Sequence, residues 1–215
     1  MDCKASFLEK LFQLFVLHGA KTLTMDDIAR EFSISKKTLY QLYKNKEALL
    51  ADVLNFISDK VLHEMEKIEN QSSCPIQSLF ERNNVINEVL GSEKNLFIMQ
   101  LMKYYPEVYH HHLLKVHSKM TNLIENNFAS GLEKKLYCED VPREMYARFL
   151  ITLFFSIDTS PLFETCDAKE KEGICKDVLN FYLDAILTEK GKERKKELLS
   201  EFKILTPNNI DEELS

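Results

Sequence analysis

The chain is poor in glycine and proline and lacks tryptophan. Its 215 residues include five glycines, five prolines and no tryptophan. Because glycine is this scarce, a Gly-rich loop that could cradle a phosphate group is not available, and no G-x-S-x-G nucleophile motif occurs. With 45% hydrophobic and 29% charged residues, the composition is typical of a helix-rich globular protein. We therefore do not expect an enzyme.

The cysteine count and the short apolar runs favour a cytoplasmic protein. The cysteines are odd in number and include no C-x-x-C pair, so neither a disulfide framework nor a zinc site is indicated. No apolar run approaches the roughly 18 residues that a membrane helix needs. The apolar stretch 11–17 is interrupted by Gln13 and preceded by Glu9, unlike the core of a signal peptide. We expect no membrane contact and no cofactor.

Charge is spread unevenly along the chain. The whole sequence has a net charge of −6, which argues against a general polyanion binder. Residues 1–48 nevertheless carry eight Lys and Arg against six Asp and Glu, so that residues 49–215 hold a net charge of −8. Any nucleic-acid interface should therefore lie in the N-terminal segment.

Apolar residues recur every three or four positions along most of the chain, and no segment alternates as a strand would. Three N-caps are expected, at Thr24 with Asp27 in a capping box, at Ser35 and at Asn45. Gly19 offers the left-handed conformation that ends a helix. The pattern predicts an all-α fold with helices over residues 4–18, 25–32, 36–42, 45–70, 75–90, 92–105, 107–129, 142–158 and 170–188.

Two domains follow from this order of helices. Residues 1–48 form a three-helix unit, and the long helix 45–70 leads from it into a helical domain over residues 49–215. Gly131 is expected to end the helix 107–129. The charged tail after about residue 191 is expected to form a short helix and then to be partly disordered.

The three-helix unit has the layout of a helix-turn-helix reader, with a short second helix, a tight turn and a polar third helix. Between positions 36 and 46 stand four lysines and no acidic residue. A solvated basic face on an ordinary helical hairpin would have the same composition. Composition alone does not decide between the two interpretations.

Residues 7–50 resemble the signature of the TetR family of transcriptional regulators. The anchors are Phe7-Leu8, Leu14-Phe15, Gly19, Leu23 to Ala29, Ile34 to Tyr40, Tyr43 and Lys46 to Leu50. Three positions depart from the family's usual residues. Ser33 stands where glycine is frequent in the turn, Lys37 stands where a small residue is frequent, and Leu11 replaces a common alanine.

The resemblance implies a role for each matched polar residue. Lys36, Lys37 and Gln41 would face base edges, for which lysine and glutamine have suitable donors and acceptors. The phosphate contacts would be Thr24, Thr38, Tyr40 and Lys46. The resemblance further implies a homodimer that binds palindromic operator DNA, most often as a repressor, and is released when a small effector binds the C-terminal domain.

Polarisable and aromatic residues in the C-terminal domain suit a largely apolar effector pocket. The residues predicted to contact the ligand are Met99, Met102, Tyr105, His110, His117, Met120 and Phe154. The two histidines fall on the apolar face of the helix 107–129 but lie one heptad apart, too far for the i, i+4 pair that grips a metal ion. They are either pocket groups or satisfied core histidines.

The helices 142–158 and 170–188 carry more apolar residues than one buried face needs. A two-fold contact between copies would cover the excess, and the residues predicted in this interface are Phe149, Leu153, Val178, Phe181, Tyr182 and Ala185. Two other functions remain open. One is a ligand-independent protein that organises the chromosome with the same helix-turn-helix, and the other is a helical enzyme whose motif arose by accident.

Overall fold

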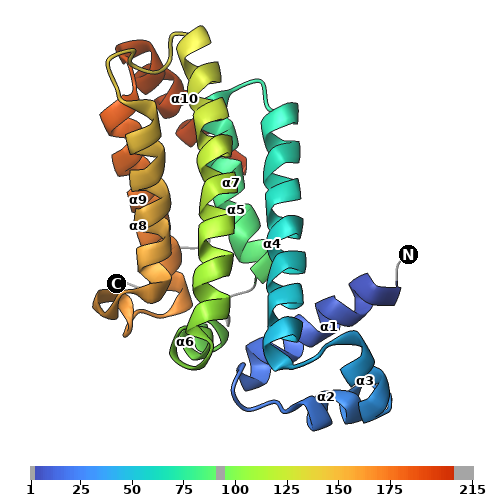
Figure 1. Ribbon diagram of the computed structural model, residues 1–215. Helices are drawn as coiled ribbons and strands as arrows, with labels where there is room; N and C mark the ends of the chain where they lie inside the picture. The colour runs from blue at the N-terminus through green and yellow to red at the C-terminus, as the bar shows by residue number, and fades with distance from the viewer. Residues whose placement is uncertain (1–2, 91–94, 206–215) are drawn as a thin grey trace.

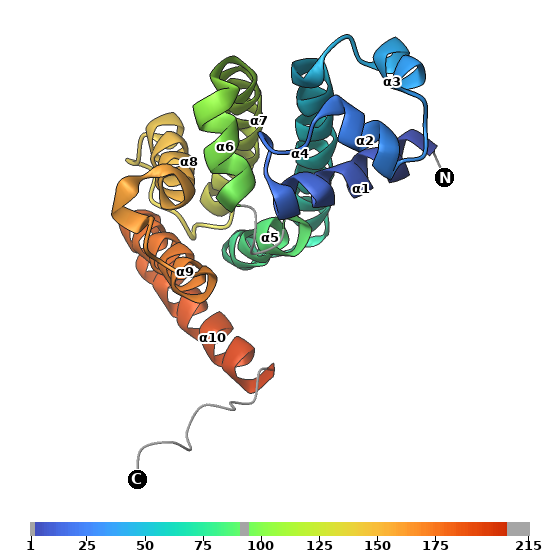
Figure 2. The same ribbon diagram turned by 90° about the horizontal axis from the view of Figure 1, so that it is seen from below.

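The structure is a computed structural model that describes residues 3–90 and 95–205 (Figure 1). Its regular elements in these ranges are helices, and an isolated bridge joins Tyr137 to Leu187. Within the same ranges, no helix is long and apolar enough to cross a membrane. Seen from below, α1 to α3 lie on one side of the molecule and α8 to α10 on the other (Figure 2).

A small N-terminal unit, which we call the head, contains α1 (Cys3–His18), α2 (Met25–Glu31) and α3 (Lys36–Leu42). The predicted N-caps of its last two helices are confirmed. Thr24 and Asp27 form a reciprocal capping box, and the Ser35 hydroxyl accepts from the Thr38 N–H at 3.0 Å. Gly19 has φ +83° and turns the chain out of α1 as expected. The core of the head is apolar, with Leu11, Phe15, Ile28, Leu39, Leu49 and Leu50 fully buried.

The long helix α4 (Lys46–Gln71) begins at the Asn45 cap, whose side chain accepts from the Ala48 N–H at 2.9 Å. Its 26 residues span about 39 Å at 1.5 Å per residue. The lower turns of α4 complete the core of the head, and the upper turns pack against the second domain. This helix is the covalent connection between the two parts.

The second domain continues through α5 (Pro75–Leu90), α6 (Asn95–Tyr104), α7 (Pro106–Glu133), α8 (Arg143–Thr159), the short 3₁₀ turn Pro161–Phe163, α9 (Ala168–Ile186) and α10 (Glu189–Leu205). Helices α8 and α9 lie side by side, with α7 next to them (Figure 1). Their shared core includes Phe128, Tyr137, Leu150, Leu179 and Leu183.

One predicted helix end is wrong. Gly131 lies inside α7, and the ring of Tyr137 packs so closely over it that a Cβ atom would clash. The left-handed residue that ends α7 is Lys135, at φ 58°. The helix expected in the charged tail is present as α10, and it continues well past Gly191 because Leu198 and the Lys195 side chain are buried against the domain. Residues 206–215 lie outside the described part, so the predicted disorder there is not addressed.

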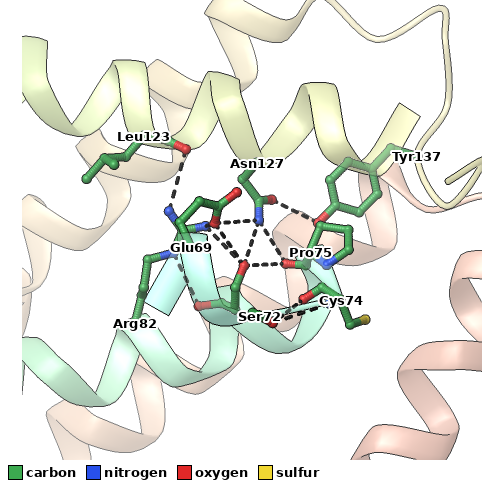
Figure 3. A network of polar contacts seen from close by, with 9 residues as sticks. Glu69, Ser72, Cys74, Pro75, Arg82, Leu123, Asn127 and Tyr137 are labelled. Atoms are coloured by element: carbon green, nitrogen blue, oxygen red, sulfur yellow. Dashed lines mark hydrogen bonds and ion pairs between the residues drawn. The ribbon is translucent and has the colours of Figure 1, made fainter. Parts of the chain in front are cut away.

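A buried polar network ties the upper end of α4 to α5 and α7 (Figure 3). The Arg82 guanidinium, 3% exposed, pairs with the Glu69 carboxylate at 2.7 Å. Asn127 donates to the Ser78 hydroxyl at 2.8 Å and accepts from the Tyr137 hydroxyl at 3.0 Å. Removing one member would leave the others buried and unpaired, which costs several kcal/mol. The network therefore fixes this end of α4.

Candidate nucleic-acid interface and internal cavity

The third helix of the head presents its polar residues to solvent. Leu39 is fully buried in the head and sets the rotation of α3. The five residues predicted to contact DNA from this helix are all exposed: Lys36, Lys37, Thr38, Tyr40 and Gln41. Tyr40 keeps 49% of its surface exposed, so its ring and hydroxyl are open to solvent. This face can donate hydrogen bonds and positive charge to a polyanion.

The turn between α2 and α3 is held by local hydrogen bonds. Ser33 adopts φ 53°, the left-handed conformation in which the resemblance placed glycine. Its N–H donates to the Arg30 carbonyl at 3.1 Å, and the Ile34 N–H donates to the Ala29 carbonyl at 2.9 Å. A side chain in this conformation costs roughly 1–2 kcal/mol. The serine therefore strains the turn.

Lys36 is paired within the head. Its ammonium lies 2.5 Å from the Asp26 carboxylate, and both side chains are well exposed. Exposed pairs of this kind contribute no more than about 1 kcal/mol. Lys36 can therefore leave Asp26 at little cost when another anion is offered.

Lys46 lies at the junction of the head with the second domain. Its ammonium donates to the carbonyl oxygens of Leu23 and Lys21, the latter at 3.3 Å, and stands 5.6 Å from the centre of the Tyr105 ring. Burial lowers the pKa of this half-buried lysine. An ammonium has three N–H donors, so one remains for a phosphate after two carbonyls are served. Thr24 is likewise engaged, because its hydroxyl donates to Asp27 at 2.6 Å.

Helix α6 also contacts the head. The Phe97 ring stacks on Phe15 at 5.7 Å and meets Phe12 edge-on at 5.8 Å. The Gln100 side chain packs over Gly19, and its oxygen accepts from the Lys21 N–H at 2.6 Å. A shift of α6 would therefore move the turn before α2.

A cavity of about 160 Å³ lies between α4, α6, α7, α8 and the head. Its wall is almost entirely apolar, and Phe12 of the head forms part of it. The other lining residues are Leu54, Ile57, Ser58, Val61, Leu62, Phe97, Ile98, Tyr109, His112, Leu113, Val116, Met120, Phe154, Phe155, Asp158 and Thr159. A space of this size can hold a small apolar molecule.

Two of the seven residues predicted to contact a ligand, Met120 and Phe154, line this cavity. Met99, Met102 and His110 do not, because they are exposed on the outer faces of α6 and α7. Tyr105 packs against the core of the head, and His117 is half-buried next to Thr121. Helix α6 turns Phe97 and Ile98 inward instead of its methionines.

Sequence reasoning missed His112, the one histidine of α7 in the cavity wall. Tyr109, His112, Val116 and Met120 recur every three or four residues, and this spacing could have identified them as one face. Burial, together with the Lys115 charge, lowers the pKa of His112 to about 4, so the ring is neutral near pH 7.

The face formed by α8 and α9 carries exposed large apolar residues. Phe149 is 51% exposed, Leu153 37% and Phe181 69%, and Met145, which was not predicted, is 50% exposed. Ala185 is also exposed and Val178 is half-buried. Tyr182 differs from the prediction, because it is 4% exposed and belongs to the core under α9. The helical spacing of apolar residues does not show which apolar face of a helix packs against the rest of its domain.

A compact three-helix head with an exposed basic third helix, joined by one long helix to a larger helical domain, defines a helix-turn-helix regulator. Residues 7–53 match the family described as bacterial regulatory proteins, tetR family. The N-terminal segment of the chain therefore carries the pattern of this family.

Relatives agree with this assignment. YuxN, an HTH-type transcriptional regulator of Bacillus subtilis (strain 168), is 30% identical over 94 residues, which are 44% of this chain and 32% of that protein. The matched region thus spans about a third of the relative. A transcriptional regulator from Cytophaga hutchinsonii has a TM-score of 0.73 at 20% identity, covering 87% of this chain and 100% of the other. For the fatty acid degradation regulator FadR from Bacillus halodurans the TM-score is 0.70 at 16% identity, covering 85% and 96%. At these identities, the two structures indicate a shared fold.

Proposed function

We propose that the chain is a cytoplasmic repressor that binds palindromic operator DNA as a homodimer and releases it when a small, largely apolar molecule enters the cavity. The observation that carries this proposal is the composition of the cavity wall. Phe12 of the head lines the same space as residues from α4, α6, α7 and α8. A molecule that fills this space contacts the head and the second domain at once.

The release mechanism that we propose uses α4 as a lever. The buried network of Glu69, Arg82 and Asn127 fixes its upper end. Leu54, Ile57 and Val61 of α4 line the cavity lower down, and the head follows at Lys46. A ligand that displaces these turns would rotate the head about the fixed end. To reverse a 99:1 preference, it must bind the released state about 10⁴-fold more tightly, which is roughly 5.5 kcal/mol.

For DNA binding, we propose that α3 enters the major groove. Lys36, Lys37 and Gln41 then contact base edges, and Thr24, Thr38, Tyr40 and Lys46 contact phosphates. The exposure of α3 supports the base contacts. The position of Lys46 at the start of α4, where the helix dipole favours an anion, supports a phosphate there.

The dimer that we propose is a four-helix contact of α8 and α9 from two copies. Phe149, Leu153, Phe181, Ala185 and the partly buried Val178 support it, because together they form an exposed apolar face. A two-fold contact would place the two α3 helices on successive major grooves, about 34 Å apart.

Selection from a random DNA library with the purified chain tests this function. We expect enrichment of a palindrome whose half-sites are one helical turn apart, bound in the presence of excess non-specific DNA. Footprinting on the host genome then identifies the neighbouring genes, and reporter expression distinguishes repression from activation. Enrichment of no sequence would contradict the proposal and favour the chromosome-organising alternative.

A further inference from the structure

The polar groups of the cavity wall come from three helices. They are Ser58 of α4, Tyr109 and His112 of α7, and Asp158 and Thr159 of α8. Two of these hydroxyl groups are already used, because Ser58 donates to the Leu54 carbonyl at 2.8 Å and Thr159 donates to the Phe155 carbonyl at 2.9 Å. Tyr109, His112 and Asp158 are the other polar groups that a ligand in the cavity can meet.

The Nδ1 atom of His112 is buried and has no hydrogen-bond partner in the described part of the chain. Buried polar atoms are nearly always hydrogen-bonded, and leaving one unpaired costs roughly 1–3 kcal/mol. Because the same ring lines the cavity, a molecule in the cavity can supply the missing partner. The burial that lowers the pKa of His112 to about 4 keeps the ring neutral, so it can accept a hydrogen bond at one nitrogen.

Asp158 brings a negative charge to the cavity wall. Its carboxylate pairs with the Lys171 ammonium at 3.8 Å, and the two side chains are 27% and 12% exposed. Asp158 lines the cavity, whereas Lys171 is not among its lining residues in the described chain. A ligand therefore meets the carboxylate side of this pair. Hydrogen-bond donors are favoured there, and an anionic group is disfavoured.

The volume limits the size of the ligand. An apolar cavity of about 150 Å³ accommodates one benzene molecule, and this cavity measures about 160 Å³. A second cavity of about 30 Å³ shares Met120 and Phe154 with it and is lined by Arg82. That cavity holds no more than a few water molecules, and the Arg82 charge is already balanced by Glu69 at 2.7 Å. It therefore adds neither a second ring nor an anion site.

We propose that the effector is a neutral molecule of single-ring size that is apolar over most of its surface and bears one hydrogen-bond donor that meets the polar groups of the wall, among them His112 and Asp158. That this molecule acts as the effector rests on the proposed function. The chemical preference itself is a property of the cavity and can be measured without DNA.

Three probes of nearly equal size and shape isolate the effect of a hydrogen-bond donor on binding: p-cresol, p-toluidine and p-xylene. Isothermal titration of the full chain should give p-cresol and p-toluidine at least tenfold tighter binding than p-xylene, because hydrogen bonds to charged or otherwise unpaired buried groups contribute this much. Benzoate, which has the ring but carries a negative charge, should bind at least tenfold more weakly than p-cresol.

Variants assign the preference to residues. His112→Leu and Asp158→Asn should each reduce the preference for p-cresol over p-xylene to a few-fold or less while p-xylene still binds. Retained p-xylene binding shows that the cavity of the variant is intact. The matched control is His111→Leu, an exposed histidine of the same helix, which should leave the preference unchanged.

The inference is overturned if p-xylene binds as tightly as p-cresol, if benzoate binds most tightly, or if none of the probes binds. These outcomes leave the proposed function standing, because the DNA selection tests that separately. If p-cresol binds as expected and the selected operator is not released, the ligand class is supported and the effector role fails instead.

Discussion

At the scale of single residues, the turn before α3 contains a strain that can be removed. Ser33 has φ 53°, and glycine adopts this conformation without steric cost. Ser33→Gly should stabilise the chain by about 0.5–1 kcal/mol, because the relief of about 1–2 kcal/mol exceeds the added backbone entropy of the unfolded chain. Urea unfolding followed by circular dichroism measures the difference.

Ser35→Gly is the matched control for Ser33→Gly. The same exchange two residues later removes the hydroxyl that caps α3 at φ −70°, so a loss of a few tenths of a kcal/mol is expected. A loss of stability in both variants would show that Ser33 is not strained.

If Lys36 contacts DNA as proposed, Asp26 competes with the DNA for it. Asp26→Asn should strengthen DNA binding several-fold, because it frees the lysine from the 2.5 Å pair and removes a negative charge from the head. Glu31→Gln makes the same change of charge on the same helix at an exposed residue. Fluorescence anisotropy with labelled DNA compares the two variants. Equal gains would mean that only the net charge of the head matters.

His112 makes stability depend on pH in a defined direction. Its pKa is about 4 in the folded chain, against 6.5 for an unperturbed histidine. Between these values the unfolded chain binds more protons, so the stabilising contribution of the neutral ring is full above pH 6.5 and is lost as the pH falls toward 4. The free energy of unfolding should therefore fall more steeply with acid in the wild type than in His112→Leu. Parallel pH profiles for the two proteins would contradict this assignment.

At the scale of helices, the apolar face of α8 and α9 is the feature that an isolated copy leaves exposed. Phe181→Asp should yield monomers, because it places a charge at the centre of this face on a side chain that is 69% exposed. The fold should survive, since Phe181 makes little contact with its own domain. Light scattering and circular dichroism give the two readouts.

Leu114→Asp is the control for Phe181→Asp. Leu114 is 59% exposed on α7 and is not part of the face formed by α8 and α9, so this variant should remain a dimer. Monomers from both substitutions, or a folded dimer from Phe181→Asp, would show that the interface lies elsewhere.

The sequence predicted where helices begin better than it predicted which side of each helix is buried. The starts of α2, α3 and α4 agree with the structure because Thr24, Ser35 and Asn45 cap them by contacts within three residues. The helix end predicted at Gly131 was wrong because this glycine makes room for the ring of Tyr137, which lies against it only in the folded chain.

The candidate sites divide in the same way. The polar residues of α3 could be identified because the matched pattern also places Leu39 in the core. For His112 the spacing indicates a face of α7 but not the cavity that this face lines. Asp158 and Tyr182 could not be assigned, because each depends on which neighbouring helix covers one side of its own helix. A single sequence carries no information on that packing.

At the scale of the whole molecule, the distribution of charge and the position of the cavity support one account. The positive N-terminal segment is carried by a helix whose far end is fixed, and the cavity lies between that fixed end and the head. By linkage, a ligand that weakens DNA binding by a given factor must itself bind more weakly by the same factor when DNA is present. Release from an operator also requires that α3 recognises a DNA sequence, since a protein that binds all DNA alike has no operator to release.

Titration of the selected operator and its single-base variants at several salt concentrations tests that requirement most directly. Lys36→Ala should cost about 1–3 kcal/mol mainly at one base pair of each half-site and relax the preference there. Lys46→Met, which keeps the stem beside Tyr105, should weaken binding to all sequences alike and reduce the salt slope by roughly 0.9 per subunit. If the two variants give the same profile across sequences and salt, α3 does not read bases as proposed and the central claim is contradicted.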